Sequence, residues 1–194
     1  MVLIFFNFLN QNQNLKDIFL FLFSMGLFAQ ETEIQNYEII KSINDFEIRF
    51  YPPAMKAKVT SDRNFAKLFR YISGNNENSE KIAMTAPVYM TSKNGKNTME
   101  FVLPSKYSEK NKVEPIDNDI EVYLSKPGYY AAIRFGGYSN SEKVKKHHDL
   151  LMKKLLENGL KPYYEEPVSL SYNSPYKVFN RRNEVLIRLD YSNP

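Results

Sequence analysis

Hydrophobic and polar residues alternate along several short stretches of this chain, as they do in half-buried β-strands. The first two such stretches are Tyr37–Lys41 and Phe46–Tyr51. A helical period then follows Ser61-Asp62, a pair typical of the start of a helix. The apolar face predicted for this helix consists of Phe65, Leu68, Phe69 and Ile72.

The same order of elements recurs in the second half of the chain. Further strands are predicted at 54–60, 81–90, 98–103, 120–124, 129–135, 167–172 and 184–190, and a second helix at 141–158. Phe46-Glu47-Ile48 aligns with Ile120-Glu121-Val122, and Ala57 aligns with Ala131. We therefore predict an α+β fold in which a duplicated strand–strand–helix–strand–strand unit, about 36–104 and 118–191, forms a distorted antiparallel β-barrel flanked by two helices.

The first 29 residues differ from everything that follows them. Lys16 precedes an apolar run from Ile18 to Phe28, and the small residue Ala29 comes next. This pattern is typical of a secretory signal peptide, and the run is shorter than the roughly 20 residues of a membrane-spanning helix. We expect a signal peptide at 1–29, a single domain at 30–194, and export to the periplasm or the extracellular space. The alternative is an uncut anchor that holds the protein at a membrane.

The composition and the missing motifs exclude several kinds of metal site, partner and catalytic site. The 194 residues include no Cys, which excludes thiolate zinc sites, thiolate-held iron–sulfur clusters and cysteine nucleophiles. The net charge is only +4, and neither a Lys/Arg run nor a helix-turn-helix signature is present, so no nucleic-acid partner is expected. The sequence also lacks a phosphate loop, a nucleophile elbow and a dinucleotide fingerprint, which favours a protein that is not an enzyme.

One segment carries a resemblance to a known family. Lys81–Val88, with the sequence KIAMTAPV, resembles the hallmark of the SOUL haem-binding protein family. Other segments occur in the family's order: Tyr37–Ile40, Phe46–Arg49, Phe65–Asn76, Gly136–Ser139 and Arg181–Val185. The resemblance covers about 36–191. It implies the repeated α+β barrel and tetrapyrrole binding, with haem associated with the first helix and with the loop between the last two strands, and it implies no established enzyme activity.

Candidate contacts for such a ligand lie on the first helix and in the hallmark segment. Arg63, Lys67 and Tyr71 are predicted to lie off the core stripe, where cations could meet haem propionates. The alternative is a solvated polar face. Met84 would supply a soft apolar wall or a thioether ligand, or would simply fill the core.

The loop between the last two strands offers a second group of candidates. Tyr176, Phe179 and Arg181 combine apolar and basic side chains, which suits a flat amphipathic anion, unless the aromatic rings pack back onto the barrel.

The two histidines are adjacent on the second helix. His148 shares a stripe with the apolar residues of that helix and is the candidate axial ligand, while His147 points about 100° away from it. A purely structural role is the alternative, and then Tyr or Met ligation, or binding without a strong axial ligand, stays open.

Two functional hypotheses from different classes result. The first is an exported, non-enzymatic protein that binds haem or another tetrapyrrole as carrier, buffer or scavenger. The second is a small-molecule-sensing or protein-partner-binding module on the same fold, because one fold hosts many functions. An enzyme acting on tetrapyrroles is a third hypothesis, although no residue marks it. Membrane contact is expected only if the amino-terminal segment is uncut.

Overall fold

The computed structural model describes residues 32–191, and this range contains eleven strands and two helices. The helices are α2 (Asn64–Ile72) and α3 (Ser141–Glu157). The strands are β1 (Glu33–Ile34), β2 (Glu38–Ile43), β3 (Phe46–Tyr51), β4 (Met55–Thr60), β5 (Thr85–Ala86), β6 (Val88–Lys93), β7 (Lys96–Val102), β8 (Ile120–Leu124), β9 (Gly128–Phe135), β10 (Val168–Ser171) and β11 (Asn183–Leu189). The predicted signal peptide or anchor at 1–29 lies outside the described residues. Within 32–191, neither helix is long and apolar enough to cross a membrane.

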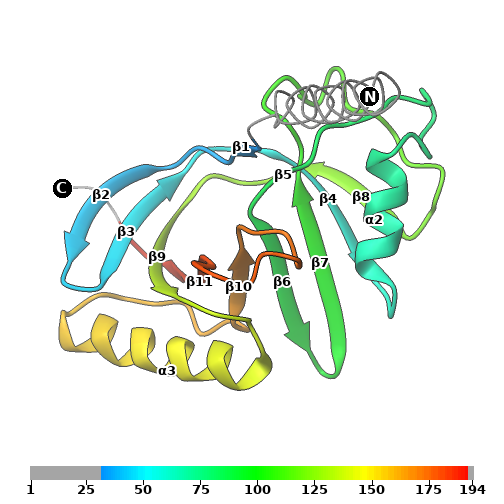
Figure 1. The fold of residues 1–194 in the computed structure, drawn as a ribbon. Helices are drawn as coiled ribbons and strands as arrows, with labels where there is room; N and C mark the ends of the chain where they lie inside the picture. Colours follow the sequence, from blue (N-terminus) through cyan, green and yellow to red (C-terminus); the bar gives the residue numbers. More distant parts are fainter. Residues whose placement is uncertain (1–31, 192–194) are drawn as a thin grey trace, which may run out of the picture. The chain divides into compact units, whose positions relative to one another are not determined.

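Nine strands form one curled antiparallel sheet in the order β2-β3-β9-β11-β10-β6-β7-β4-β8. β1 and β5 form a separate parallel pair. α3 packs on β9 and β11, whereas α2 packs on β4 and β7, so the two helices lie against separate parts of the sheet (Figure 1). The curled sheet makes a half-barrel. The predicted α+β class, with a distorted antiparallel barrel and two flanking helices, is confirmed.

The order strand–strand–helix–strand–strand occurs twice, as β3-β4-α2-β6-β7 and as β8-β9-α3-β10-β11, if the two-residue strand β5 between α2 and β6 is left aside. The two units exchange strands: β3 of the first pairs with β9 of the second, and β4 of the first pairs with β8 of the second. The units also meet at the centre of the sheet, where β6 pairs with β10. Adjacent strands form hairpins at β2–β3, β6–β7 and β10–β11. β3 and β4 are instead separated in the sheet, so each unit depends on the other for strand pairing.

Two of the hairpin turns depend on residues that tolerate a left-handed backbone. The β6–β7 turn places Asn94 at φ 51° and Gly95 at φ 76°, a combination that matches the twist of the flanking strands. The β2–β3 turn places Asn44 at φ 51°. β2 also contains a register shift between Ile39 and Lys41, so the strand is irregular as well as being at the edge of the sheet.

α2 begins later than predicted. Its first residue is Asn64, and the preceding Arg63 makes no capping bond with its side chain. The Oδ1 of Asn64 accepts hydrogen bonds from the backbone N–H and the hydroxyl of Ser61, at 2.6 and 3.0 Å. Ser61 and Asp62 therefore form a turn that leads into the helix instead of capping it.

The buried face of α2 also differs from the prediction. Leu68 and Ile72 are buried as expected, but Tyr71 is buried with them. The prediction that Tyr71 lies off the core stripe is wrong, because its hydroxyl donates to the carbonyl of Val113 (2.7 Å) and so lets the ring enter the core. The two phenylalanines of the predicted face are about half exposed and stack on each other with ring centroids 5.7 Å apart.

α3 agrees with its predicted bounds. The side chain of Asn140 caps the helix by accepting a hydrogen bond from the backbone N–H of Lys143 (2.9 Å). Leu151 and Leu155 are buried against β9 and β11, as the apolar stripe predicts. Gly159 follows the end of the helix with φ 68°, where a glycine is free of strain.

The two faces of the sheet differ in character. The face that carries the helices holds two apolar clusters, one around α2 and one around α3. We call the opposite face the inner face. It has a cluster of its own that includes five buried or half-buried tyrosines, three of them in strands β3, β6 and β9 and two of them next to the ends of β2 and β10. These are Tyr37, Tyr51, Tyr89, Tyr130 and Tyr172.

Candidate functional site

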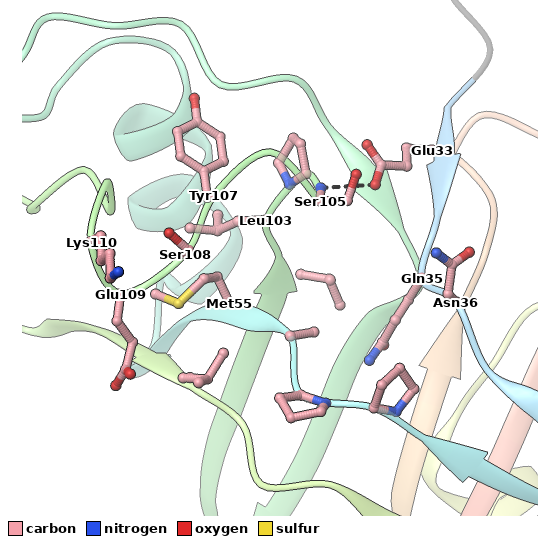
Figure 2. Close-up of a pocket in the computed structure, with 16 residues that line it drawn as sticks. Glu33, Gln35, Asn36, Met55, Leu103, Ser105, Tyr107, Ser108, Glu109 and Lys110 are labelled. Carbon is pink, nitrogen blue, oxygen red and sulfur yellow. Dashed lines mark hydrogen bonds between the residues drawn. The ribbon is translucent and has the colours of Figure 1, made fainter.

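An apolar pocket of about 420 Å³ lies at one end of the half-barrel (Figure 2). It forms where β4 begins and where β7 and β8 end. The segments 33–36 and 104–110 supply the remaining walls. Its size falls within the range of small-molecule sites, roughly 300–1,000 Å³.

The motif behind the family resemblance helps to build this pocket. β5 lies within that motif and pairs with β1, which sets Glu33 opposite Thr85. The backbone N–H of Gln35 donates to the carbonyl of Ala86 (2.8 Å), and the hydroxyl of Thr85 donates to the carbonyl of Val102. The motif thus ties β1 and the end of β7 together, and both of these contribute side chains to the pocket.

Apolar side chains make half of the lining. They are Pro52, Pro53, Ala54, Met55, Val102, Leu103, Pro104 and Leu124. The charged lining residues are Glu33, Glu109 and Lys110, all exposed. The carboxylate of Glu33 accepts a hydrogen bond from the backbone N–H of Ser105 (2.8 Å), as Figure 2 shows. Lys110 is therefore the group in this lining that can pair with an anionic substituent of an apolar ligand.

Two lining residues belong to types that coordinate haem iron elsewhere in nature, a thioether and a phenol. Figure 2 shows the sulfur of Met55 among the lining side chains. The Tyr107 hydroxyl donates to Glu80 (2.6 Å), and burial together with this bond raises the pKa of the phenol above its usual value. Tyr107 therefore stays protonated, and Met55 is the better candidate donor.

Gln35 connects the pocket to the inner face of the sheet. Its side-chain oxygen accepts a hydrogen bond from the Tyr89 hydroxyl (2.7 Å), and both residues are buried. Gln35 also belongs to the pocket lining, whereas Tyr89 belongs to the inner-face cluster. A ligand that moved Gln35 would disturb the tyrosine cluster behind it.

The inner face also contains a buried ion-pair network. Arg49 and Glu184 face each other with contacts of 2.7 and 3.2 Å, and Arg182 donates to the same carboxylate at 2.8 Å. Tyr172 adds a hydroxyl bond of 2.8 Å. Burial would raise the pKa of the Glu184 carboxyl, but the hydrogen bonds and charge of Arg49, with the charge of Arg182, hold it below its usual value. In all, five donor contacts satisfy this carboxylate, so Glu184 is a structural ion-pair partner.

The residues predicted on α2 have different environments. Arg63 is exposed and could meet an anionic ligand. The Nζ of Lys67 pairs with Asp117 (3.2 Å) and with Asp119, and the hydrogen bond to Asp119 raises the pKa of this lysine. A propionate would have to compete with both carboxylates. Tyr71 is buried in the core, as described above.

Met84 and the predicted loop residues also fall in separate places. Met84 is half-buried at the edge of the cluster around α2. Tyr176 and Phe179 are highly exposed in the loop between β10 and β11. Arg181 is buried, and its Nη1 donates to backbone carbonyls of the same loop, including those of Ser174 (2.9 Å) and Lys177 (2.6 Å). Arg181 therefore holds the loop together and is not presented to solvent.

Neither histidine belongs to the lining of the Figure 2 pocket. His148 lies on α3 next to Asp149, with 3.5 Å between its Nδ1 and the carboxylate. His147 was predicted to lie about 100° away from the apolar stripe of the helix, yet it stacks on the buried ring of Phe135 at a centroid distance of 4.5 Å.

The structure therefore does not gather the predicted residues into this pocket. The pocket residues that sequence reasoning missed include Met55, Lys110 and Leu124. A partial signal was present, because Pro52-Pro53 breaks the strand pattern just before Met55 and so predicts an irregular, apolar strand start. Lys110 had no such signal, because a lysine in a polar loop is normally solvated.

The architecture defines a class of α+β half-barrel proteins with two exchanged units and an apolar pocket at one end. The SOUL heme-binding protein family matches residues 32–188, and the chain belongs to this family. The resemblance inferred from the hallmark segment is thereby confirmed.

Curated relatives agree with this assignment. The chain is 30% identical over 158 residues to heme-binding protein 2 of Homo sapiens, and the aligned region covers 72% of this chain and 76% of that protein. It is 27% identical over 132 residues to heme-binding protein 1 of Xenopus laevis, and the aligned region covers 64% of this chain and 68% of that protein.

Solved structures share the fold at much lower identity. The C-terminal domain of EcmrR matches with a TM-score of 0.55 at 11% identity, over 80% of this chain and 99% of that domain. A hydrolase from Listeria innocua matches with a TM-score of 0.50 at 10% identity, over 86% of this chain and 96% of that one. At such identities the likeness concerns the fold alone.

Proposed function

We propose that this protein binds haem or another tetrapyrrole and acts as a carrier, buffer or scavenger without enzymatic activity. Membership of the SOUL family and the names of the curated relatives support haem as the ligand. The single structural observation that carries the proposal is the apolar pocket braced by the family's hallmark segment.

The lining residues fit a macrocycle with an apolar body and carboxylate substituents. The prolines, leucines and valine would cover the ring, and each Å² removed from water contributes about 25 cal/mol. Lys110 would pair with a propionate, and the Met55 thioether would be available to the iron. When bound, haem would supply redox-active iron, and the role of the protein residues is to bury and orient it.

We also propose that the protein is exported. The apolar run from Ile18 to Phe28 followed by Ala29 supports cleavage after residue 29 or 30, and an uncut anchor is the alternative. Mass spectrometry of the protein recovered from the source cells distinguishes the two, because cleavage moves the first residue to position 30 or 31.

Haemin titration followed by the Soret band tests the binding site. Leu124 lines the pocket and is 38% exposed, so Leu124→Glu should weaken haemin binding about tenfold to a hundredfold by placing a carboxylate against the apolar ring. Leu150 on α3 is also 38% exposed, and Leu150→Glu is the matched control. It should change affinity by less than about twofold.

A second variant separates this pocket from the site that the family resemblance implies. If haemin binds at the loop, the double variant Tyr176→Ser, Phe179→Ser will lose affinity and Leu124→Glu will not. That result would place the haemin site at the loop between β10 and β11 and would still support haem binding as the function. No saturable Soret shift from the wild-type chain, shown folded by circular dichroism, would overturn haem binding. The small-molecule-sensing or partner-binding hypothesis would then lead.

A further inference from the structure

The loop between β10 and β11 projects three apolar side chains into solvent. Tyr176 is 90% exposed, Phe179 is 81% exposed, and Val178 lies between them with more than half of its surface exposed. Single exposed apolar residues are ordinary, but three within four positions form a patch that normally contacts something. We call residues 174–180 the aromatic tip.

The aromatic tip is braced from behind. The Nη1 of buried Arg181 donates to the carbonyls of Ser174 (2.9 Å), Pro175 (3.5 Å) and Lys177 (2.6 Å). The same guanidinium stacks on the ring of Tyr138, 4.5 Å from its centroid. The exposed aromatic residues are therefore held outward by a built framework, which lowers the entropy lost when the tip docks on a surface.

The chain segment that carries the tip has charge of one sign. Residues 167–183 contain Lys177, Arg181 and Arg182 but no Asp or Glu. Arg181 is buried and Arg182 is paired with Glu184, which leaves Lys177 as the exposed cation of the tip. Lys143 adds a second cation at its base, because its Nζ bonds to the carbonyl of Tyr138 (3.1 Å).

We propose that the aromatic tip is a docking site for an anionic lipid bilayer. Side chains that are four-fifths exposed at a loop form a convex projection, which can enter the headgroup region, whereas a protein partner would need a larger surface of matching shape. Tyrosine, phenylalanine and lysine are the residue types that favour this region. Anionic lipid matches the sign of Lys177 and Lys143. The proposal does not rest on haem binding, although the same loop is the second candidate haem site tested above.

The chain contains no Trp, so a single introduced tryptophan reports on one place. Phe179→Trp in the full-length chain places the reporter on the tip. Tyr164→Trp is the matched control, because Tyr164 is 80% exposed but lies outside the tip. Each variant is mixed, without haem, with vesicles of phosphatidylcholine alone or with one-fifth phosphatidylglycerol. The readouts are the emission maximum and quenching by brominated lipid.

We expect a blue shift and quenching for Phe179→Trp with the anionic vesicles, little change with neutral vesicles, and no change for Tyr164→Trp. Adding Lys177→Glu to Phe179→Trp should abolish the shift. Because the signal is local, membrane association through residues 1–31 would not imitate it. An equal shift at both positions, or no shift at position 179, would overturn the proposal. The second result would leave the tip as a surface for a protein partner.

Discussion

At the scale of single residues, the pair of Arg49 and Glu184 has the largest expected effect on stability. The two residues lie 135 positions apart in the sequence and are 4% and 1% exposed. Their separation explains why sequence reasoning could not pair them, since each simply occupied a position in a predicted strand. The hydrogen bonds that satisfy both charges appear only when β3, β9 and β11 are assembled.

Glu184→Gln should lower the free energy of unfolding by about 3–5 kcal/mol, because it removes the buried carboxylate that Arg49 and Arg182 share. Arg49 then retains only the more exposed carboxylate of Glu47, which lies 2.7 Å from its Nε. Urea denaturation measures this change. Glu121→Gln is the control, since Glu121 pairs with Lys58 at 2.7 Å in a more exposed position, and its loss should cost less than about 1 kcal/mol. If both variants lost the same unfolding free energy, burial would not be what makes the Arg49–Glu184 pair stabilising.

The same pair predicts how stability depends on pH. The folded pKa of Glu184 lies below its unfolded value, so its contribution is complete above the unfolded pKa of about 4.3. Stability should fall as pH decreases from about 5 and passes through the lower folded pKa. Unfolding free energies measured between about pH 6 and 3 should decline less steeply for Glu184→Gln than for the wild type. If the two curves were parallel, carboxylates other than Glu184 would determine how stability depends on pH.

At the scale of elements, helices whose apolar period is not interrupted were predicted best. α3 has its predicted stripe, whereas α2 buries Tyr71 and exposes part of its predicted apolar face. A hydrophobic pattern counts tyrosine as partly polar because of its hydroxyl. In the structure the Tyr71 hydroxyl donates a hydrogen bond to the carbonyl of Val113, which allows the ring to be buried in the core. The periodicity of a helix cannot reveal a hydrogen-bond acceptor that lies in a loop distant in the sequence. The pocket could not be predicted for the same reason, because four separated segments of the chain form its lining.

Asn140→Ala should destabilise the protein by about 1 kcal/mol, because it removes the side-chain acceptor for the Lys143 N–H at the start of α3. Asn140→Asp retains an acceptor and should restore most of the loss. Thermal unfolding of the three proteins checks the prediction. If Asn140→Asp were as unstable as Asn140→Ala, the capping bond would not be the cause.

At the scale of the whole molecule, the repeated order of elements was visible in the sequence, but the exchange of strands between units was not. Aligned segments such as Phe46-Glu47-Ile48 and Ile120-Glu121-Val122 do become corresponding strands, β3 and β8. Adjacent strands in sequence usually pair, however, and this general rule would place β3 beside β4. In the structure β3 pairs with β9 and β4 with β8, which no local pattern encodes.

Strand exchange predicts that neither half folds alone. A fragment of residues 32–104 would leave β3 without β9 and β4 without β8. We expect fragments 32–104 and 118–191 to lack near-ultraviolet circular dichroism when separate and to recover it when mixed. A native-like spectrum from either fragment by itself would show that the units are autonomous.

The irregular first strand of the sheet has a consequence for solubility. Within residues 32–191, the half-barrel ends in β2 and β8, and an open edge can recruit strands from other molecules into growing aggregates. The register shift between Ile39 and Lys41 bends β2, and Glu38 and Lys41 place charge along it. β8 is only five residues long and carries Glu121. The sheet can therefore remain open without seeding fibres.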